Sequence, residues 1–191
     1  MHKLWLVITG LTVATGLLRT DREQAMALPI DIQLAMFDKI LTYDRAFRTH
    51  VGDEVVVGIL FQERYRASLL AKTSVLDAVE RDGRTTIGRV PVRFIVIELT
   101  EGDALEQAVS EHAVDVMYVT PLRAYDLAAI SRFGNTHNII TLTGVPEYVT
   151  AGIAIGVGLR GDKPEILVNL DVCEAAGIEL SSQLLRLARV L

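Results

Sequence analysis

Two hydrophobic periodicities alternate along residues 28–150, one typical of helices and one typical of buried strands. In the segment 28–47, apolar residues such as Ile30, Leu34 and Phe37 recur at helical spacing, which predicts a helix. The segment EVVVGILF at 54–61 is a continuous apolar run rich in β-branched residues, as expected for a strand covered on both faces. The alternation continues with predicted helices at 64–83, 101–113 and 121–134 and predicted strands at 90–99, 114–120 and 138–143.

Glycine, proline and aspartate mark the expected ends of these helices. Gly83 should close the helix at 64–83, and Asp103 is a plausible N-cap for the next one. In the segment PLRAYDLAAISRFG, Pro121 suits the first turn of a helix and Gly134 suits the position just after its end.

The pattern changes after residue 150. The apolar segments AGIAIGVGL and PEILVNL are separated only by RGDK, which is too short for a crossover and predicts an antiparallel hairpin. Strands that alternate with helices form parallel sheets with right-handed crossovers. The predicted fold is therefore α/β: a single three-layer domain with a mainly parallel sheet of about four strands and flanking helices, plus a C-terminal antiparallel β-hairpin and two short helices.

The closing phrase DVCEAAGIELSSQLLRLARVL predicts those two short helices. Asp171 suits the N-cap of the first, Gly177 its end, and Ser181 the N-cap of the second. Leu184, Leu187 and Leu191 recur at helical spacing, so we expect the second helix to run to the end. A helix of about ten residues is marginal alone in water. We expect it to dock on the hairpin and sheet, with the groove of a dimer or partner as the alternative.

The N-terminal segment has the order of a secretory signal peptide. MHK is a short basic start, residues 4–18 carry no charge, and Ala25-Met26-Ala27 is a small-x-small cleavage site. Because the apolar run is shorter than the ~20 residues that usually span a bilayer, a retained N-terminal membrane anchor is the alternative. We predict a signal peptide at 1–27, an exported domain at 28–191, and no direct membrane insertion of the mature domain.

Charge and cysteine content restrict the function further. The net charge is −5, which argues against a nucleic-acid binder, since such binding depends on Lys and Arg neutralising phosphates. With Cys173 as its one cysteine, the chain has no internal disulfide. We expect Cys173 to be a buried small residue.

Several short motifs suggest chemistry but have simpler structural interpretations. Gly156-Val-Gly158-Leu-Arg-Gly161 matches GxGxxG, yet a dinucleotide site needs these glycines between a strand and a helix, not along a hairpin. Close backbone approach is the better interpretation. The tripeptide RGD at 160–162 fits an ordinary turn.

Motifs for catalysis and metal binding are absent from the sequence. The four histidines lack local metal-ligand spacing, and there is no GxSxG elbow, P-loop or HExxH. We therefore expect no enzyme activity, no catalytic residues, no metal site and no cofactor.

The carboxyl ends of the predicted strands provide a candidate ligand-binding rim, because open parallel sheets bind ligands beyond those ends. The rim residues are Thr120, Pro121, Thr143, Gly144 and Glu147, with a helix N-terminus at Pro121 able to face an anion. The alternative is that these threonines and prolines are only caps and turn residues.

The order of several phrases resembles a known family. ALPIDIQLAMFDKILTYDR, VVVGILFQ, VDVMYVTP, TLTGVPEYVTAGIAIGV and ILVNLDVCEAAGIELSSQLLRLARVL together resemble the YfiR-like family of exported bacterial proteins over residues 28–191. The resemblance implies a periplasmic, non-enzymatic α/β domain that often forms homodimers and represses a membrane-bound diguanylate cyclase by engaging its periplasmic sensing region. It thereby implies control of cyclic di-GMP and biofilm. The family's characterised member is disulfide-bonded, so its redox control does not carry over to a chain with only Cys173.

Two functional hypotheses follow. The first is a periplasmic regulatory protein that inhibits a membrane signalling protein by direct protein–protein interaction. The second is a periplasmic small-ligand-binding protein that resembles one lobe of a solute-binding protein and uses the rim at Thr120 and Thr143.

Overall fold

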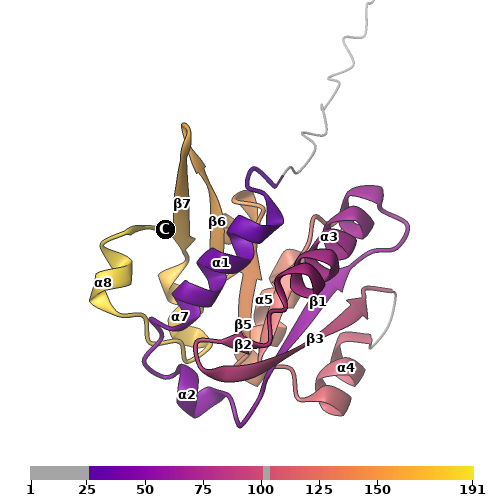
Figure 1. Ribbon diagram of the computed structural model, residues 1–191, viewed down its shortest axis with the longest axis horizontal. Helices are drawn as coiled ribbons and strands as arrows, with labels where there is room; N and C mark the ends of the chain where they lie inside the picture. The colour runs from indigo at the N-terminus through magenta and orange to yellow at the C-terminus, as the bar shows by residue number, and fades with distance from the viewer. Residues whose placement is uncertain (1–25, 101–103) are drawn as a thin grey trace, which may run out of the picture.

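An eight-stranded sheet runs through the computed structural model, which describes residues 26–100 and 104–191 (Figure 1). Its order is β2-β3-β1-β4-β5-β6-β7-β8. The strands are β1 (Val55–Phe61), β2 (Thr86–Ile87), β3 (Val90–Glu98), β4 (Val116–Val119), β5 (Ile140–Thr143), β6 (Ile155–Arg160), β7 (Lys163–Val168) and β8 (Ala188–Val190). The run β3-β1-β4-β5-β6 is parallel, β2 is antiparallel to β3, β7 is antiparallel to β6, and β8 is parallel to β7.

The predicted α/β class is confirmed, but the sheet is larger than predicted. β6 is a fifth parallel strand, because Leu142 and Thr143 of β5 pair in parallel with Ile155 and Gly156 of β6. The connection contains only the short helix α6 (Glu147–Thr150), which has no helical period long enough to recognise in the sequence. The hairpin of β6 and β7 is antiparallel as predicted and belongs to the main sheet.

Helices cover both faces of the sheet (Figure 1). The longer ones are α1 (Ile30–Leu41), α3 (Arg66–Asp82), α4 (Ala104–His112) and α5 (Leu127–His137), and the shorter ones are α2 (Phe47–His50), α7 (Leu170–Ala175) and α8 (Ser182–Leu185). One core cluster joins the sheet to α1 and α3, and a second joins it to α4 and α5. Every residue of β1 is buried, as expected for a strand between two helix layers.

The predicted end of α3 is confirmed, and the predicted ends of α5 are wrong. Gly83 closes α3 with a left-handed φ of 55°. α5 begins at Leu127, not at Pro121, because the Asp126 carboxylate accepts a hydrogen bond from the Ala128 amide (3.0 Å) and caps it there. Gly134 lies inside α5, packed against the Ile139 carbonyl, and α5 ends before Asn138. Asp103 lies outside the described residues.

The C-terminal phrase contains one predicted helix, one shortened helix and an unpredicted strand. Asn169, not Asp171, caps α7, since its side chain accepts from the Val172 amide (3.3 Å). The Ser181 cap of α8 is confirmed at 3.3 Å. α8 stops at Leu185 and the chain continues as β8, which pairs with β7. The expected helix of about ten residues is therefore wrong.

The glycines of the GxGxxG motif lie in β6 and its turn, as the structural interpretation predicted. A β-carbon at Gly156 would collide with Val149, and one at Gly158 would collide with Pro146. Gly161 adopts φ 61° in the two-residue turn of the hairpin. Among the described residues, no helix has the length and apolar content needed to cross a membrane.

Candidate functional site

Thr120 and Thr143, the two hydroxyls of the predicted rim, lie side by side at the carboxyl ends of β4 and β5. Both side chains are fully buried. The Thr120 hydroxyl donates to the Leu60 carbonyl (2.7 Å), and the Thr143 hydroxyl donates to the Val119 carbonyl (3.0 Å). These hydroxyls fasten neighbouring strands to each other, so neither faces an open site.

The other three rim residues are divided between the interior and the surface. Pro121 and Gly144 are buried, and Glu147 is exposed at the start of α6. No helix N-terminus lies at Pro121, so the expected anion-facing geometry there is absent from this part of the fold. Ligand binding by the five-residue rim stays a prediction.

Gln62 closes the position where the strand order reverses, between β1 and β4. Ligands of open α/β sheets bind at such switch points. Here the Gln62 amide group donates to the Arg123 carbonyl (3.2 Å), and the Arg123 amide donates to the Gln62 side-chain oxygen (2.7 Å). The buried Ser68 hydroxyl accepts from the Gln62 backbone amide (2.8 Å) and shares a hydrogen bond with Thr120 (2.7 Å). The crevice is thus bridged by the chain itself.

Gln33 of α1 covers the neighbouring strand ends. Its fully buried amide donates to the Leu28 carbonyl (2.7 Å) and accepts from the Tyr118 hydroxyl (2.8 Å). The amide lies against Gly144, where a β-carbon would collide with it. Burial raises the pKa of Tyr118, so its hydroxyl stays protonated and remains a donor.

Tyr148 fixes the loop that follows β4. Its hydroxyl donates to the Leu122 carbonyl (3.1 Å) and accepts from the Leu122 amide (2.7 Å). Burial raises the pKa of Tyr148 to about 12, so this phenol also remains neutral. Together with Gln62 and Gln33, Tyr148 fills the carboxyl end of the sheet with hydrogen-bonded side chains of the protein.

A groove remains open at the outer side of this end. It is lined by polar and charged residues from the segments after β1, β3 and β4, with a volume of about 650 Å³. The residues are Gln62, Glu63, Arg64, Tyr65, Glu98, Leu99, Thr100, Arg123 and Ala124. Its mixed charges suit a small polar ligand better than an apolar one.

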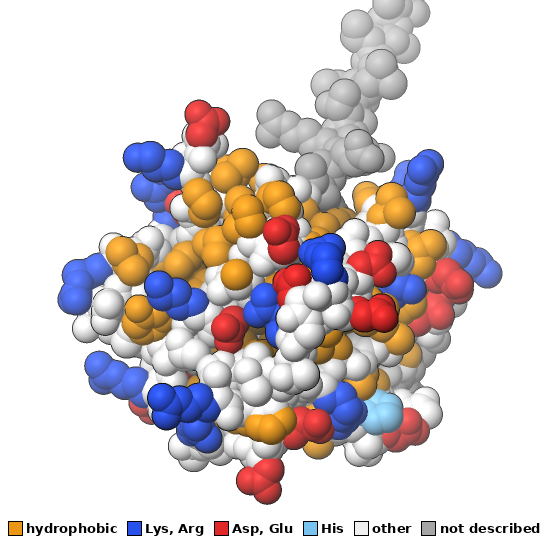
Figure 2. Space-filling model, viewed as in Figure 1, with side chains coloured by type: hydrophobic (Ala, Val, Ile, Leu, Met, Phe, Trp, Pro, Cys, Tyr) orange, Lys and Arg blue, Asp and Glu red, His pale blue; other side chains and the backbone are white. Residues whose placement is uncertain are grey.

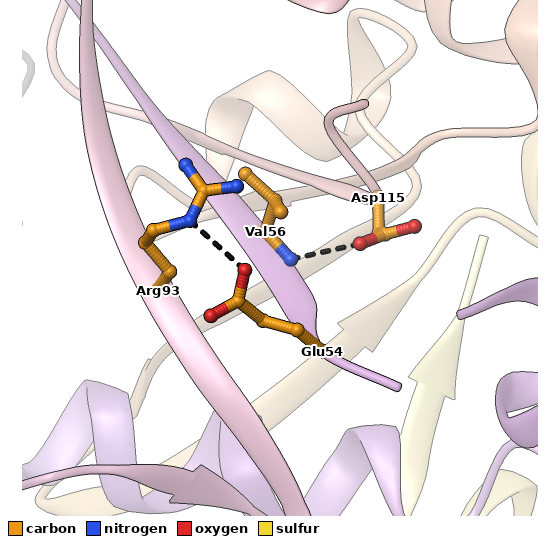
Figure 3. Close-up of polar contacts among 4 residues, drawn as sticks. All are labelled: Glu54, Val56, Arg93 and Asp115. Carbon is orange, nitrogen blue, oxygen red and sulfur yellow. Dashed lines mark hydrogen bonds and ion pairs between the residues drawn. The ribbon is translucent and has the colours of Figure 1, made fainter. Parts of the chain in front are cut away.

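A second polar cluster lies at the amino ends of β1, β3 and β4 (Figure 3). The Asp115 carboxylate accepts from the Val56 amide (2.8 Å), and Arg93 donates to Glu54 (2.9 Å). Burial raises the pKa of Asp115, and the hydrogen bond from Val56 and the charge of Arg93 oppose that shift. These contacts connect the ends of neighbouring strands, so they stabilise the sheet.

Cys173, His112 and His137 are the remaining candidates for a reactive or metal-binding group. Cys173 is buried, and burial raises the pKa of its thiol to about 12, so it is a poor nucleophile. His112 and His137 are exposed, and His137 stacks on Phe133 at 4.3 Å. In residues 26–100 and 104–191, no group of His, Cys, Asp and Glu is arranged to hold a metal ion.

An apolar surface with exposed side chains lies on the hairpin. We use the term hairpin face for Leu159, Pro164, Ile166, Ala188 and Val190, whose cross-strand pairing places them on the same face of β6, β7 and β8. Deeper residues of this face pack in the core with α1, whereas Leu159 is 41% and Val190 43% exposed. Hydrophobic side chains gather over the hairpin and the adjoining α1 in Figure 2.

The polar residues that close the strand ends were not identified from the sequence. Gln33 is the one polar position within the apolar stripe of α1, and Gln62 directly follows the buried strand β1. These two positions were the sequence features that could have indicated a structural role for Gln33 and Gln62. Their partners Tyr118 and Arg123 are far away in sequence, so the pairing itself could not be derived.

Solved structures of similar fold include a substrate binding protein, an ABC domain and a conserved domain protein. The chain aligns with a ligand-free, open substrate binding protein with adhesive properties from Clostridium difficile (TM-score 0.59, 14% identity, 86% of this chain and 60% of that chain). It also aligns with an ABC domain in complex with L-Trp from Streptococcus pneumonia (0.58, 12%, 85% and 61%) and with a conserved domain protein from Vibrio cholerae (0.57, 12%, 85% and 60%). At these identities the likeness concerns the fold alone.

The chain thus spans about 60% of the length of each of these solved chains. No curated protein matches the sequence. The family model for YfiR/HmsC-like proteins matches residues 61–189, which is more than half of the chain. The protein therefore belongs to the YfiR/HmsC-like family.

Proposed function

We propose that the protein is a periplasmic regulator that inhibits a membrane-bound signalling enzyme of the diguanylate cyclase type by direct contact. Membership of the YfiR/HmsC-like family supports a regulatory, non-catalytic role and a periplasmic location. Through the cyclase, the protein controls cyclic di-GMP and biofilm formation. A signal peptide at 1–27 delivers the domain to the periplasm, although these residues lie mostly outside the described part.

The main support for this proposal is the contrast between the switch point of the sheet and the hairpin face. At the switch point of the sheet, Gln62, Ser68 and Thr120 occupy the place of a ligand. The hairpin face instead leaves large apolar side chains in contact with water. A switch point that the chain itself bridges, together with an open apolar surface on the hairpin, favours binding of a folded protein over binding of a small molecule at the switch point.

The hairpin face also has the chemistry of a protein contact surface. Arg160 and Lys163 at the hairpin tip and Arg189 on β8 alternate along the strands with the residues of the hairpin face, so their side chains belong to the opposite face of the same strands. Glu165, only 10% exposed, pairs with both Arg160 and Arg189 (3.5 Å for Arg189) and ties the three strands together. An exposed apolar surface on strands that are held together in this way suits contact with another protein.

Deleting the gene and measuring cyclic di-GMP tests the proposal in the cell. We expect the nucleotide level to rise in the deletion strain and to return to normal when the gene is restored. An unchanged level, in cells where the intact protein is shown to be present in the parent strain, rejects the proposal.

A small-ligand-binding role is the second candidate. It is supported by the likeness in fold to a substrate binding protein and to a domain that holds L-Trp, and by the open groove beside Tyr65 and Arg123. A thermal-shift screen with amino acids, nucleotides and inorganic anions separates the two candidates, since a ligand of the folded state raises the melting temperature by mass action. A concentration-dependent rise that Tyr65→Ala removes favours this second role.

A further inference from the structure

A second exposed surface lies on β6, β7 and β8, on the side opposite the hairpin face. Arg160 of β6 and Lys163 of β7 are directly paired across the hairpin, so their side chains share one side of it. Arg189 of β8 is paired with Leu167, which alternates with Lys163 along β7 and therefore lies on the same side. We use the term reverse face for Arg160, Lys163, Glu165, Arg189 and the adjoining Leu187 and Leu191.

Positive charge is in excess on the reverse face. Glu165 pairs with Arg160 and with Arg189 (3.5 Å for Arg189), and its own side chain is only 10% exposed. Lys163 forms no ion pair within residues 26–100 and 104–191, and the side chains of Arg160 and Arg189 remain 69% and 48% exposed. Like charges that face each other directly on neighbouring strands destabilise the pairing, so the Arg160–Lys163 pair favours an anion beside it.

The nearest charges in the sequence do not remove this excess. Asp162, in the turn between β6 and β7, is the other carboxylate of the hairpin, and Arg186 directly precedes Leu187. Four cations therefore accompany two carboxylates in the hairpin and the segment around β8. The whole chain has a net charge of −5, so this end of the sheet differs in sign from the protein as a whole.

Exposed aliphatic side chains adjoin these cations. Leu187 is 67% exposed, more than any other large hydrophobic residue that the structure describes. Leu191 is 44% exposed, and its amide donates to the Val168 carbonyl (2.9 Å), so the strand alternation continues and places Leu191 on the side of Arg189. The reverse face thus combines basic and aliphatic side chains.

The hairpin also projects from the domain. Its tip extends beyond the neighbouring strands and helices (Figure 1). A partner with an extended surface can therefore reach Arg160 and Lys163 without first meeting the helices that cover the sheet.

We propose that the reverse face binds the surface of an anionic phospholipid membrane. Arg160, Lys163 and Arg189 contact the phosphate groups of the lipids. Leu187 and Leu191 enter the boundary between the headgroups and the acyl chains, as apolar side chains of surface-bound proteins do. The contact stays at the membrane surface, and no segment of the described chain crosses the bilayer.

A membrane fits this surface better than a soluble polyanion. A polyanion would neutralise the cations but would leave Leu187 and Leu191 in water, whereas a lipid surface offers both phosphate and apolar groups. The negative charge of the rest of the protein is repelled by such a membrane, so the basic end is the one that approaches it. This contact does not depend on the regulatory role, and it leaves the hairpin face free.

Flotation of the protein purified from the cell envelope with phospholipid vesicles tests the proposal. At low ionic strength, the wild-type protein should float with vesicles of phosphatidylglycerol and phosphatidylcholine, and it should not float with phosphatidylcholine alone. Added salt should release it, since contacts between exposed charges are screened. The double variant Arg160→Gln/Lys163→Gln should bind the anionic vesicles at least tenfold more weakly. Leu187→Gln, which keeps every charge, should also weaken binding.

Arg81→Gln/Arg132→Gln is the matched control, because it removes the same charge at exposed arginines of α3 and α5. It should bind like the wild type. Three results would overturn the proposal: no flotation of the wild type with anionic vesicles, equal flotation with both kinds of vesicle, or wild-type binding by both the double variant and L187Q. Release by inorganic phosphate at an ionic strength at which chloride leaves the protein bound would also overturn it, because the site would then take free phosphate. Loss of cyclase inhibition with intact vesicle binding would reject only the regulatory role.

Discussion

Buried polar side chains determine how the carboxyl end of the sheet is closed. Gln33, Thr120 and Thr143 are each fully buried, and each forms hydrogen bonds with other groups of the same chain. A buried polar group without a partner costs about 1–3 kcal/mol, so the loss of one partner from these networks would destabilise the fold by about that amount. At the scale of single residues, the strand ends at which a ligand was expected are therefore held together by hydrogen bonds within the chain.

Replacing Gly144 with alanine tests how closely the Gln33 side chain packs against the strand ends. The added β-carbon would collide with the Gln33 side chain, which is fully buried and held by hydrogen bonds with Leu28 and Tyr118. We expect a loss of about 1–3 kcal/mol in the free energy of unfolding, as for other overpacked sites. Urea unfolding measures it. Gly52→Ala is the control, since nothing lies within 4 Å of its β-carbon position, and equal stabilities of the two variants would contradict the account.

Asp115 gives a prediction about pH. Burial raises its pKa in the folded state, so its contribution to stability is full below its ordinary pKa of 3.8 and is lost as pH rises through the raised value. Asp115→Asn keeps an acceptor for the Val56 amide and carries no charge to bury. We expect the stability of D115N relative to wild type to increase between acidic and neutral pH.

Asp115→Ala is the comparison for this measurement. It removes the acceptor at 2.8 Å from the Val56 amide and should therefore be less stable than D115N by about 1–3 kcal/mol at every pH. Thermal unfolding from pH 3 to 7 follows both variants. A D115N curve parallel to wild type over this range would show that the folded state does not raise the pKa of this carboxyl.

At the scale of elements, local periodicity identified the longer helices and four of the parallel strands, because their apolar residues recur at helical spacing or form continuous runs. Elements defined by distant partners were not predictable. β8 reads as a continuation of a leucine-rich helix, but Leu187 is 67% exposed and the backbone pairs with β7 instead. The rim residues were placed correctly at the strand ends, while their burial depends on Gln33 and Gln62, which no local pattern indicates.

Removing residues 182–191 tests the role of the C-terminal elements. The truncation exposes the core site of Leu184, which is 1% exposed, removes the Arg189 partner of Glu165, and strips β8 from β7. Loss of one buried leucine alone costs about 2–5 kcal/mol, so the melting temperature of the whole domain should fall substantially. Leu187→Ala should change stability by less than about 0.5 kcal/mol. A truncated protein that melts like the intact one would contradict this role.

At the scale of the whole molecule, the two candidate binding surfaces of the proposed functions lie on different elements. The hairpin face lies on β6, β7 and β8, near one end of the strand order, and the groove beside Tyr65 and Arg123 lies at the ends of β1, β3 and β4. A substitution at Leu159 can therefore test contact with a protein without altering the groove.

The central claim is inhibition by contact through the hairpin face. Its most direct measurement is the rate of cyclic di-GMP synthesis in spheroplasts of the deletion strain, whose periplasmic surfaces are accessible, after addition of purified protein. Wild-type protein should lower the rate, and Leu70→Glu should act like wild type because Leu70 lies on α3, away from the hairpin. Leu159→Glu should require at least about tenfold more protein, equivalent to about 1.4 kcal/mol of binding free energy. A rate that wild-type protein leaves unchanged, or that L159E lowers as effectively as wild type, would contradict the account.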